Sequence, residues 1–418
     1  MKILWITNTL FPAPSKALGL PAPVAGGWMY GLAGQLAAQR EIELAVATVY
    51  QGKELKIFDL DGIRYYLLPS RKPGTYPEYL EPIWEKICEE FSPDIVHIHG
   101  TEYMHALACM RACKDLKYVI SIQGLVGVCA RYYYAGLTNI DILKNITFRD
   151  VVRWDTIFQG KQKFVQQGVF ETEYIKRTQH VIGRTRWDHD HVKAMNPAAE
   201  YHFCNETLRD AFYSADTWDI SQKTDYTIFL SQAGYPIKGL HQVLKAVALL
   251  VTEFPRIRVR VSGHNIIDAG TLTSRVKRNG YGSYISGLIR SLGLEKNIEF
   301  TGPLSEERMI VEYKNTHLFI CPSSIENSPN SLGEAQLLGV PSIASYVGGV
   351  PDMVTHGETG LLYRFEEVEM LAECIRRIFT DKDFAMRLSI KGVEVAKQRH
   401  YREGNLNQLI NIYRLIRA

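Results

Sequence analysis

Short apolar runs alternate with longer segments of helical periodicity along almost the whole chain of 418 residues. Continuous apolar strands joined by helices are typical of parallel sheets that helices cover on both faces. The sequence therefore predicts an α/β fold made of two doubly wound, Rossmann-like units. The expected strands are KILWIT, ELAVATVY, RYYLLP, DIVHIHG, YVISIQG and HVIGRT in the first half, and TIFLSQ, RVRVSG, IEFTG, LFICPS and PSIAS in the second.

A chain of this length usually divides into two domains. The polar stretch at residues 213–225 has no regularly spaced apolar residues and is the best candidate for the linker between the domains. We therefore expect a first domain at residues 1–212 and a second at residues 213–401. The last helix, at residues 402–418, has an apolar face that must be buried against another part of the protein. The pattern of its apolar residues allows it to pack on either domain.

The composition excludes several classes of protein. Hydrophobic residues make up 46% and charged residues 22%, and the net charge is +3, so neither disorder nor a nucleic-acid partner is supported. The seven cysteines lack paired CxxC spacing, which favours reduced thiols in the cytoplasm and no metal site. No apolar window is long enough to cross a membrane, and the first apolar run reads as a buried strand.

The segment ENSPNSLGE carries two carboxylates, Glu326 and Glu334, on either side of an expected helix start. Ser328 and Pro329 have the form of an N-cap followed by proline, which predicts a helix from about Pro329 to Leu338. A helix N-terminus at the carboxyl end of a parallel strand suits a phosphate group. The alternative is that the turn only caps the helix and both glutamates are solvated. The amides expected to face the ligand are those of Asn330, Ser331 and Leu332.

The stretch SSIENSPNSLGEAQLLGVPSIASYVGGVPDMVTHGETGLLY resembles the signature of retaining glycosyltransferases of family 4. In that signature two glutamates bracket seven residues and precede a small-residue helix, a GxP strand, a GG loop and a GLL strand. The preceding segments, TIFLSQAGYPIKGLHQVLKA and IEFTG, are similar to the same family. The resemblance is strongest over residues 226–363 and implies a GT-B fold, in which two Rossmann-like domains face each other across a cleft and a C-terminal helix returns to the first.

The resemblance also implies roles for individual residues. Glu334 would hold the ribose hydroxyls of the donor, because a carboxylate accepts two hydrogen bonds. Glu326 would contact the donor sugar at its anomeric carbon. Lys238, in PIKG, matches the phosphate-binding lysine and would neutralise the leaving diphosphate. Gly26 and Gly27 match the turn where the backbone approaches phosphate closely.

The chain departs from the family pattern at three positions. Gln232 stands where many relatives have an arginine, so part of the positive charge opposite the diphosphate is missing. Gln123 replaces a histidine; its amide can hold a sugar hydroxyl but cannot take a proton. Pro329 replaces a glycine and removes one backbone donor. His97 and His99 end one strand, and either could touch the acceptor; we expect that they cannot both point the same way, and we assign His99 to the acceptor.

By this resemblance the protein is a retaining glycosyltransferase that moves a sugar from a nucleoside-diphosphate sugar to an acceptor hydroxyl. UDP is favoured over GDP as the nucleotide, and no further cofactor or metal is expected. The acceptor would be a saccharide or a lipid-linked molecule in the synthesis of cell-surface polysaccharide or glycolipid. Two alternatives stay open: a GT-B nucleotide-sugar epimerase, and a non-catalytic protein that binds nucleotide sugars.

Residues 144–164 mix basic and aromatic side chains. Such a segment can lie on an anionic membrane surface, which would make the protein peripheral to the inner face of the cell membrane. It can equally pack its aromatic side chains on the first domain.

Overall fold

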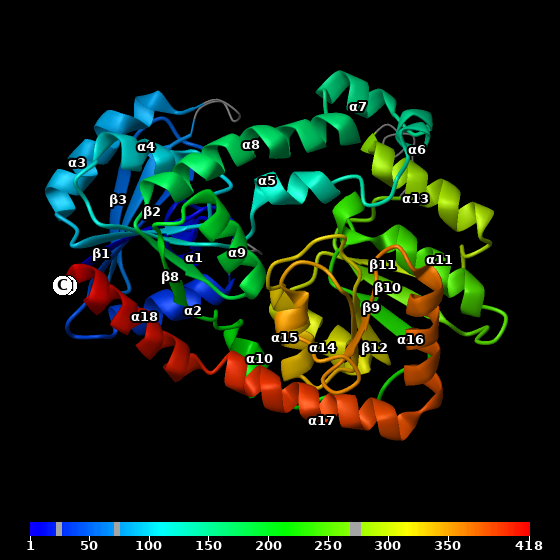
Figure 1. The fold of residues 1–418 in the computed structure, drawn as a ribbon. Coiled ribbons are helices and arrows are strands. Elements are labelled where there is room, and N and C mark those ends of the chain that lie inside the picture. Colours follow the sequence, from blue (N-terminus) through cyan, green and yellow to red (C-terminus); the bar gives the residue numbers. More distant parts are fainter. Residues whose placement is uncertain (22–26, 71–75, 268–276) are drawn as a thin grey trace. The chain divides into compact units, whose positions relative to one another are not determined.

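The computed structural model describes residues 1–21, 27–70, 76–267 and 277–418, and the chain forms two compact units, each drawn in Figure 1. The first unit consists of Met1–Gly127, Gln166–Asp210 and His400–Ala418. The second consists of Val128–Val165 and Ala211–Arg399.

The first unit is built on an eight-stranded sheet of order β3-β4-β2-β1-β5-β6-β7-β8. Every neighbouring pair is parallel except β3 and β4, which are antiparallel. The six predicted strands of this half are confirmed, but β3 and β8 escaped prediction because their residues are largely exposed and lack a continuous apolar run. The strands are β1 (Lys2–Ile6), β2 (Glu43–Tyr50), β3 (Lys56–Leu60), β4 (Ile63–Pro69), β5 (Ile95–His99), β6 (Tyr118–Ser121), β7 (His180–Gly183) and β8 (Glu200–Phe203).

Helices cover this sheet, as its buried strands require. Trp5 on β1 and Val119 on β6 are fully buried in the hydrophobic core of the first unit. The helices of this unit are α1 (Pro12–Ala17), α2 (Gly27–Ala37), α3 (Glu81–Phe91), α4 (His105–Ala112), α9 (Arg186–Met195), α18 (Arg402–Arg417) and the end of α8 (Ile157–Arg177).

The second unit is built on a six-stranded, fully parallel sheet of order β11-β10-β9-β12-β13-β14. Helices α11, α13 and α16 contribute Leu244, Ile285 and Ile375 to the core beside the central strands (Figure 1). The strands are β9 (Thr227–Leu230), β10 (Arg258–Ser262), β11 (Ile298–Gly302), β12 (Leu318–Cys321), β13 (Ser342–Ser345) and β14 (Leu361–Tyr363). The helices are the end of α5 (Val126–Cys129), α6 (Asn139–Lys144), α7 (Phe148–Arg153), the start of α8, most of α10 (Asp210–Ser214), α11 (Leu240–Leu250), α13 (Gly280–Ser291), α14 (Glu306–Asn315), α15 (Asn330–Leu337), α16 (Val368–Thr380) and α17 (Lys382–Arg399).

The predicted α/β fold with two Rossmann-like units is confirmed. The units differ from the expected domain bounds mainly because residues 128–165 pack with the second unit and not with the first. The other bounds shift slightly: the second unit resumes at Ala211, and the last segment of the first unit begins at His400. The segment at residues 128–165 contains α6 and α7, and its polar contacts within the second unit decide its place: Thr147 Oγ1 donates to the Arg278 carbonyl at 2.9 Å, and Ser283 Oγ to Asn145 Oδ1 at 3.1 Å.

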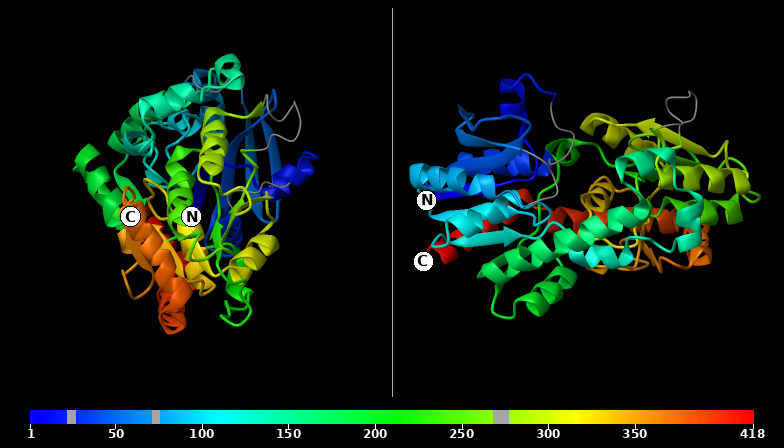
Figure 2. Two further views of the ribbon diagram at one scale, coloured as in Figure 1. Left: turned by 90° about the vertical axis from the view of Figure 1, so that its right-hand side faces the viewer. Right: turned by 90° about the horizontal axis from the view of Figure 1, so that it is seen from above.

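Helix α18 belongs to the core of the first unit, where Leu409, Ile412 and Ile416 are buried. Its Tyr413 hydroxyl accepts a hydrogen bond from Trp5 Nε1 at 2.8 Å and lies 2.5 Å from His97 Nδ1. Figure 2 shows the two chain ends side by side, and Met1 and Ala418 line the same surface hollow. The last helix is thus fastened to the two central strands of this sheet.

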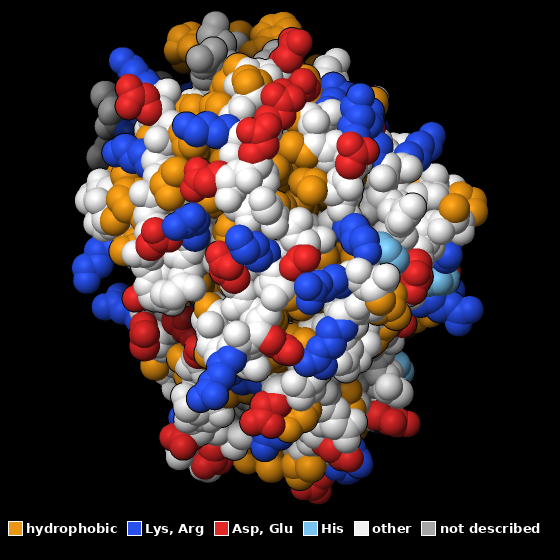
Figure 3. Space-filling model, turned by 90° about the vertical axis from the view of Figure 1, so that its left-hand side faces the viewer, with side chains coloured by type: hydrophobic (Ala, Val, Ile, Leu, Met, Phe, Trp, Pro, Cys, Tyr) orange, Lys and Arg blue, Asp and Glu red, His pale blue; other side chains and the backbone are white. Residues whose placement is uncertain are grey.

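On the face shown in Figure 3, acidic and basic side chains are interspersed. This mixture agrees with the net charge of +3. Within the described residues, none of the helices combines the length and apolarity that crossing a bilayer requires.

Replacing Tyr413 with phenylalanine should destabilise the first unit. The change would leave the indole N–H of Trp5 without its acceptor inside the core, which costs about 1–3 kcal/mol. Thermal unfolding measured by circular dichroism should show a lower midpoint for Tyr413→Phe. The exposed Tyr401→Phe on the same stretch of chain is the control and should leave the midpoint unchanged. Equal midpoints for the two variants would contradict this role of Tyr413.

Candidate active site

The loop after β12 places a carboxylate against a lysine. Glu326 Oε1 lies 2.5 Å from Lys238 Nζ and accepts a second hydrogen bond from Ser323 Oγ at 2.7 Å. The sequence separates Lys238 and Glu326 widely, but β9 and β12 are neighbours in the sheet, so the loops after them meet at its carboxyl edge. Two of the three residues predicted to be catalytic therefore form an ion pair.

Lys238 ends a short 3₁₀ segment, Pro236–Lys238, and its side chain is nearly buried. Burial lowers the pKa of Lys238, but the neighbouring charge of Glu326 outweighs it, so the pKa lies above the ordinary lysine value. The ammonium group is therefore charged at physiological pH and positioned at the edge of the sheet.

Two glycines allow the loops of this ion pair to approach each other. Gly239 has a φ of +69°, and a Cβ there would clash with the carbonyl oxygen of Pro322. Gly348 has a φ of +52°, and a Cβ there would clash with the carbonyl oxygen of Glu326 itself. The next amide, that of Gly349, donates to the same Glu326 carbonyl at 3.0 Å. The glycine pair Gly348–Gly349 thus fixes the backbone of Glu326.

The start of α15 differs from the prediction in its details. The helix begins at Asn330 with Pro329 as its N-cap, and no side chain caps it. Ser328 does not cap the helix, because its hydroxyl contacts Met353 Sδ at 3.6 Å and Arg399 at 3.3 Å. The Leu332 amide donates to the Pro329 carbonyl at 3.0 Å, so it does not face a ligand as predicted. Asn330 and Ser331 lie half-buried at the helix start.

Glu334 lies inside α15 and is 4% exposed. Glu326 and Glu334 therefore differ in setting: the first is in a loop against Lys238, and the second is in a buried turn of helix. The solvated alternative is wrong for both side chains. Gln232, after β9, is exposed.

The predicted residues of the first unit lie at the carboxyl edge of its own sheet. Gln123 Nε2 donates to Glu206 Oε1 at 2.7 Å, and Glu206 also forms an ion pair with the buried Arg184. Gly27 is the first residue of α2, whereas Gly26 lies outside the described residues. Gln123 is thus part of a charged network that the sequence did not indicate.

The expectation that His97 and His99 cannot both point the same way is wrong. Their rings stack with centroids 3.9 Å apart, because side chains two residues apart on a strand share a face. His99 is 3% exposed, and its ring nitrogens have no hydrogen-bond partner among the described residues. Burial, helped by the charge of Arg184, lowers the pKa of His99 to about 3, so the ring is neutral.

Two groups of side chains in the described residues have ligand atoms close enough for a metal ion. One is Cys88, Cys109 and Cys113, in which the Sγ atoms of Cys88 and Cys109 are 4.0 Å apart. The other is His180, Glu200 and His202 on β7 and β8. Both groups belong to the first unit; Cys88 lies on α3, whereas Cys109 lies on α4 and Cys113 is the C-cap of α4. Cys109 and Cys113 lie four residues apart in the sequence, but the spacing did not indicate that Cys88 joins them or that the second group forms.

Residues 216–395 match the family described as Glycosyl transferases group 1. The D-inositol 3-phosphate glycosyltransferase of Corynebacterium urealyticum is 26% identical over 178 residues, which are 43% of this chain and 40% of that protein. The chain thus spans about two fifths of the length of such curated relatives.

Solved structures match over the whole chain. Sucrose-phosphate synthase from Thermosynechococcus elongatus superposes with a TM-score of 0.74 at 18% identity, covering 100% of this chain and 99% of the other. Anabaena HepE in complex with UDP and glucose has a TM-score of 0.67 at 16% identity, covering 99% of both chains. At such identities the likeness concerns the fold, and it confirms the predicted GT-B fold class.

Replacing Gly239 with alanine should disrupt the Lys238 loop. The added Cβ meets a backbone oxygen in a left-handed conformation, and relieving this costs about 3 kcal/mol. We expect a thermal midpoint lower by about 5 °C or more. Gly287→Ala in α13 is the control, because a Cβ there meets nothing within 4 Å and should leave the midpoint unchanged or raise it slightly. A midpoint unchanged by Gly239→Ala would mean that the loop does not need this approach.

Proposed function

Residues 216–395 match the glycosyl transferases group 1 family, and we propose on this premise that the protein is a retaining glycosyltransferase. It moves a sugar from a nucleoside-diphosphate sugar to an acceptor hydroxyl. The observation that carries the proposal is the Lys238–Glu326 ion pair, which lies in the matched region together with the buried Glu334. The curated relative named above is a glycosyltransferase, which supports the same activity.

The donor we propose is a UDP-sugar. Anabaena HepE, which shares the fold, was crystallised with UDP-glucose. In this chain Glu334 would accept hydrogen bonds from the ribose hydroxyls. Lys238 would supply the positive charge opposite the diphosphate, so the proposal assigns no metal ion or further cofactor to this step. Gln232 adds a neutral amide where an arginine would add charge.

The ion pair explains how the transfer would proceed. A diphosphate oxygen takes the place of Glu326 as the partner of Lys238, and the carboxylate then faces the anomeric carbon. The acceptor oxygen forms its bond to this carbon on the side from which the phosphate oxygen departs. The hydroxyl proton passes to the departing phosphate oxygen, because the amide of Gln123 cannot accept a proton. Glu326 stabilises the positive charge that develops on the sugar ring.

The acceptor would be a saccharide or a lipid-linked saccharide, as in the synthesis of cell-surface polysaccharide. Gln123 and His99 lie at the carboxyl edge of the first sheet, the edge at which such folds bind ligands. The neutral His99 ring has one donor and one acceptor nitrogen to offer a hydroxyl.

Lys238→Ala and Glu334→Gln should affect activity in different ways. Lys238→Ala removes charge that acts on the leaving group and should lower kcat by about 100-fold or more, with UDP binding reduced less. Glu334→Gln replaces the ribose acceptor and should weaken UDP binding by about tenfold. The measurements are UDP release from UDP-glucose and calorimetric titration with UDP.

Glu358→Gln is the matched control for these variants, because Glu358 is an exposed carboxylate of the same family domain. It should leave both measurements unchanged. Normal turnover by Lys238→Ala, or undiminished UDP binding by Glu334→Gln, would contradict the assigned role of that residue.

We further propose that helices α6 and α7 contact an anionic membrane. Six apolar side chains on these helices and at the C-cap of α7 are between 59% and 74% exposed, and they form what we call the α6–α7 patch: Ile140, Leu143, Phe148, Val151, Val152 and Trp154. Lys144 and Arg153 are exposed on the same helices and complement anionic lipid headgroups. Of the four aromatic residues in 144–164, only Phe158 and Phe164 are half-buried, and they pack on Tyr134 and Tyr133 of the second unit.

Both helices are short but well fixed. Thr138 and Asp141 form a capping box at the start of α6, and Thr147 and Asp150 form one at the start of α7. The α6–α7 patch is therefore held in place by helix caps and by the hydrogen bonds of Thr147 and Ser283 described above. Burial of such side chains in the headgroup region stabilises binding in proportion to their apolar area.

The double variant Phe148→Ser/Trp154→Ser should lose membrane binding. Vesicles of phosphatidylglycerol and phosphatidylcholine should sediment the unmodified protein, and the variant should bind more than about tenfold more weakly. The control is Leu249→Ser/Val311→Ser, which removes two side chains of the second unit that are each 54% exposed. If the unmodified protein stays in the supernatant, or if the two double variants sediment alike, the α6–α7 patch does not bind membranes.

A further inference from the structure

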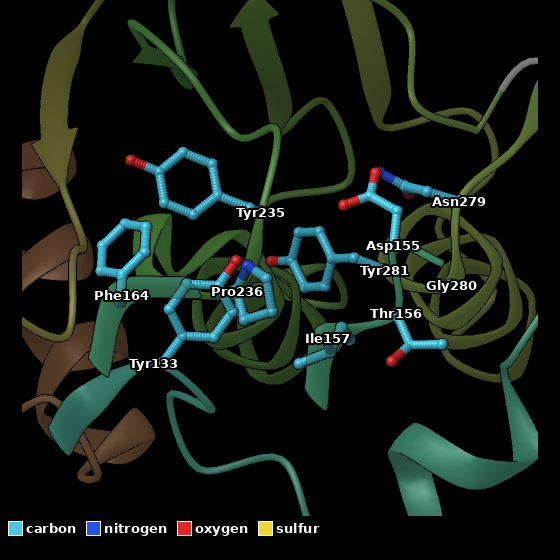
Figure 4. Close-up of a pocket in the computed structure, with 10 residues that line it drawn as sticks. All are labelled: Tyr133, Asp155, Thr156, Ile157, Phe164, Tyr235, Pro236, Asn279, Gly280 and Tyr281. Atoms are coloured by element: carbon cyan, nitrogen blue, oxygen red, sulfur yellow. The ribbon is translucent and has the colours of Figure 1, made fainter. Parts of the chain in front are cut away.

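A pocket of about 290 Å³ lies within the second unit, where residues 128–165 meet the Rossmann-like core (Figure 4). Tyr133, Asp155 and Phe164 line the pocket from residues 128–165, which we call the inserted segment. Tyr235 and Asn279 line it from the core. The sequence did not indicate that these five residues share a pocket, because the segment and the core meet only in the folded chain.

Aromatic rings form much of the wall of this pocket. Tyr133 and Phe164 pack edge to face with centroids 4.9 Å apart, and Figure 4 shows the Tyr235 ring beside them. Tyr281 adds a fourth ring. Flat rings of this kind offer large apolar surfaces that lose little conformational entropy when a ligand packs on them.

The polar groups of the pocket are neutral or acidic. Figure 4 shows the Asp155 carboxylate and the Asn279 amide close together on one side. Asp155 accepts hydrogen bonds from Arg149 and Lys163, at 3.3 and 3.2 Å, but neither cation is among the described residues that line the pocket. A phosphate would therefore find no direct cationic partner here, whereas hydroxyl groups would find acceptors and donors.

The pocket is preformed by contacts of its own. Gly160 leaves room for the hydroxyl of Tyr133, since a Cβ at this position would clash with it. The backbone on both sides of Tyr133 is fixed to the core: Ser324 Oγ donates to the Tyr132 carbonyl at 3.1 Å, and His241 Nε2 lies 2.8 Å from the Ala135 carbonyl. The side chains are thus positioned without a ligand, which lowers the cost of binding one.

We propose that this pocket is a binding subsite for a neutral saccharide ring. The aromatic walls would pack on the apolar C–H face of the ring, and Asp155 and Asn279 would hydrogen-bond to its hydroxyls. A volume near the lower end of ligand pockets, which span ~300–1,000 Å³, suits a small ligand of this kind.

The subsite adjoins the candidate active site. The ring centroid of Tyr235 is 5.8 Å from Lys238 Nζ, so this residue borders both the pocket and the Lys238–Glu326 ion pair. A saccharide in the pocket would therefore lie beside the place where transfer occurs. The inference that this saccharide is part of a substrate rests on the proposed function, whereas the inference that the pocket binds a saccharide does not.

Saturation-transfer difference NMR on the full chain tests the subsite without any donor present. The probes are glucose, galactose, N-acetylglucosamine and maltose, with uridine as the competing aromatic ligand. At least one saccharide should show binding, and Tyr133→Ala and Phe164→Ala should each weaken it by about tenfold. Tyr133→Phe keeps the ring and should retain most of the binding.

The control is Tyr132→Ala, which removes the neighbouring exposed ring. It should leave saccharide binding unchanged, and all four variants should bind UDP as the unmodified protein does. The inference is overturned if no saccharide binds to a protein that still binds UDP, if the two alanine variants bind saccharide normally, or if uridine displaces the saccharide. Absence of UDP binding with intact saccharide binding would instead contradict the proposed function alone.

Discussion

The contact between Lys238 and Glu326 is the interaction on which the rest of this site depends. A nearly buried lysine is costly unless a carboxylate meets it, and here the two charges lie 2.5 Å apart. The glycines at 239 and 348 allow the loops to come this close. A polar ligand that enters must compete with this ion pair, and under the proposed function a diphosphate would take the place of Glu326 beside Lys238.

Much of the fold follows from the sequence, because parallel strands buried on both faces must be continuously apolar. Strands β1 and β9 and their neighbours in the two sheets were predicted from such continuous apolar runs. Strands β3 and β8 were not, since edge strands with exposed residues carry no such pattern. The placement of residues 128–165 depends on contacts such as Thr147 with Arg278, which join positions far apart in the chain.

The candidate site was predictable in part. Lys238, Glu326 and Glu334 were identified by their resemblance to a family signature, and the structure adds how the first two meet. Ser323, which donates to Glu326, and Tyr235, which borders Lys238, were missed. Tyr235 lies three residues before Lys238 in the sequence, but only the fold shows that it faces a pocket made by the inserted segment.

A crystal structure of the full chain with bound UDP would test the central claim most directly. The account predicts that a β-phosphate oxygen lies within hydrogen-bond distance of Lys238 Nζ, that Glu326 has left the lysine, and that the ribose hydroxyls bind Glu334. If UDP were bound elsewhere while Lys238 and Glu326 kept their contact, the claim would be contradicted.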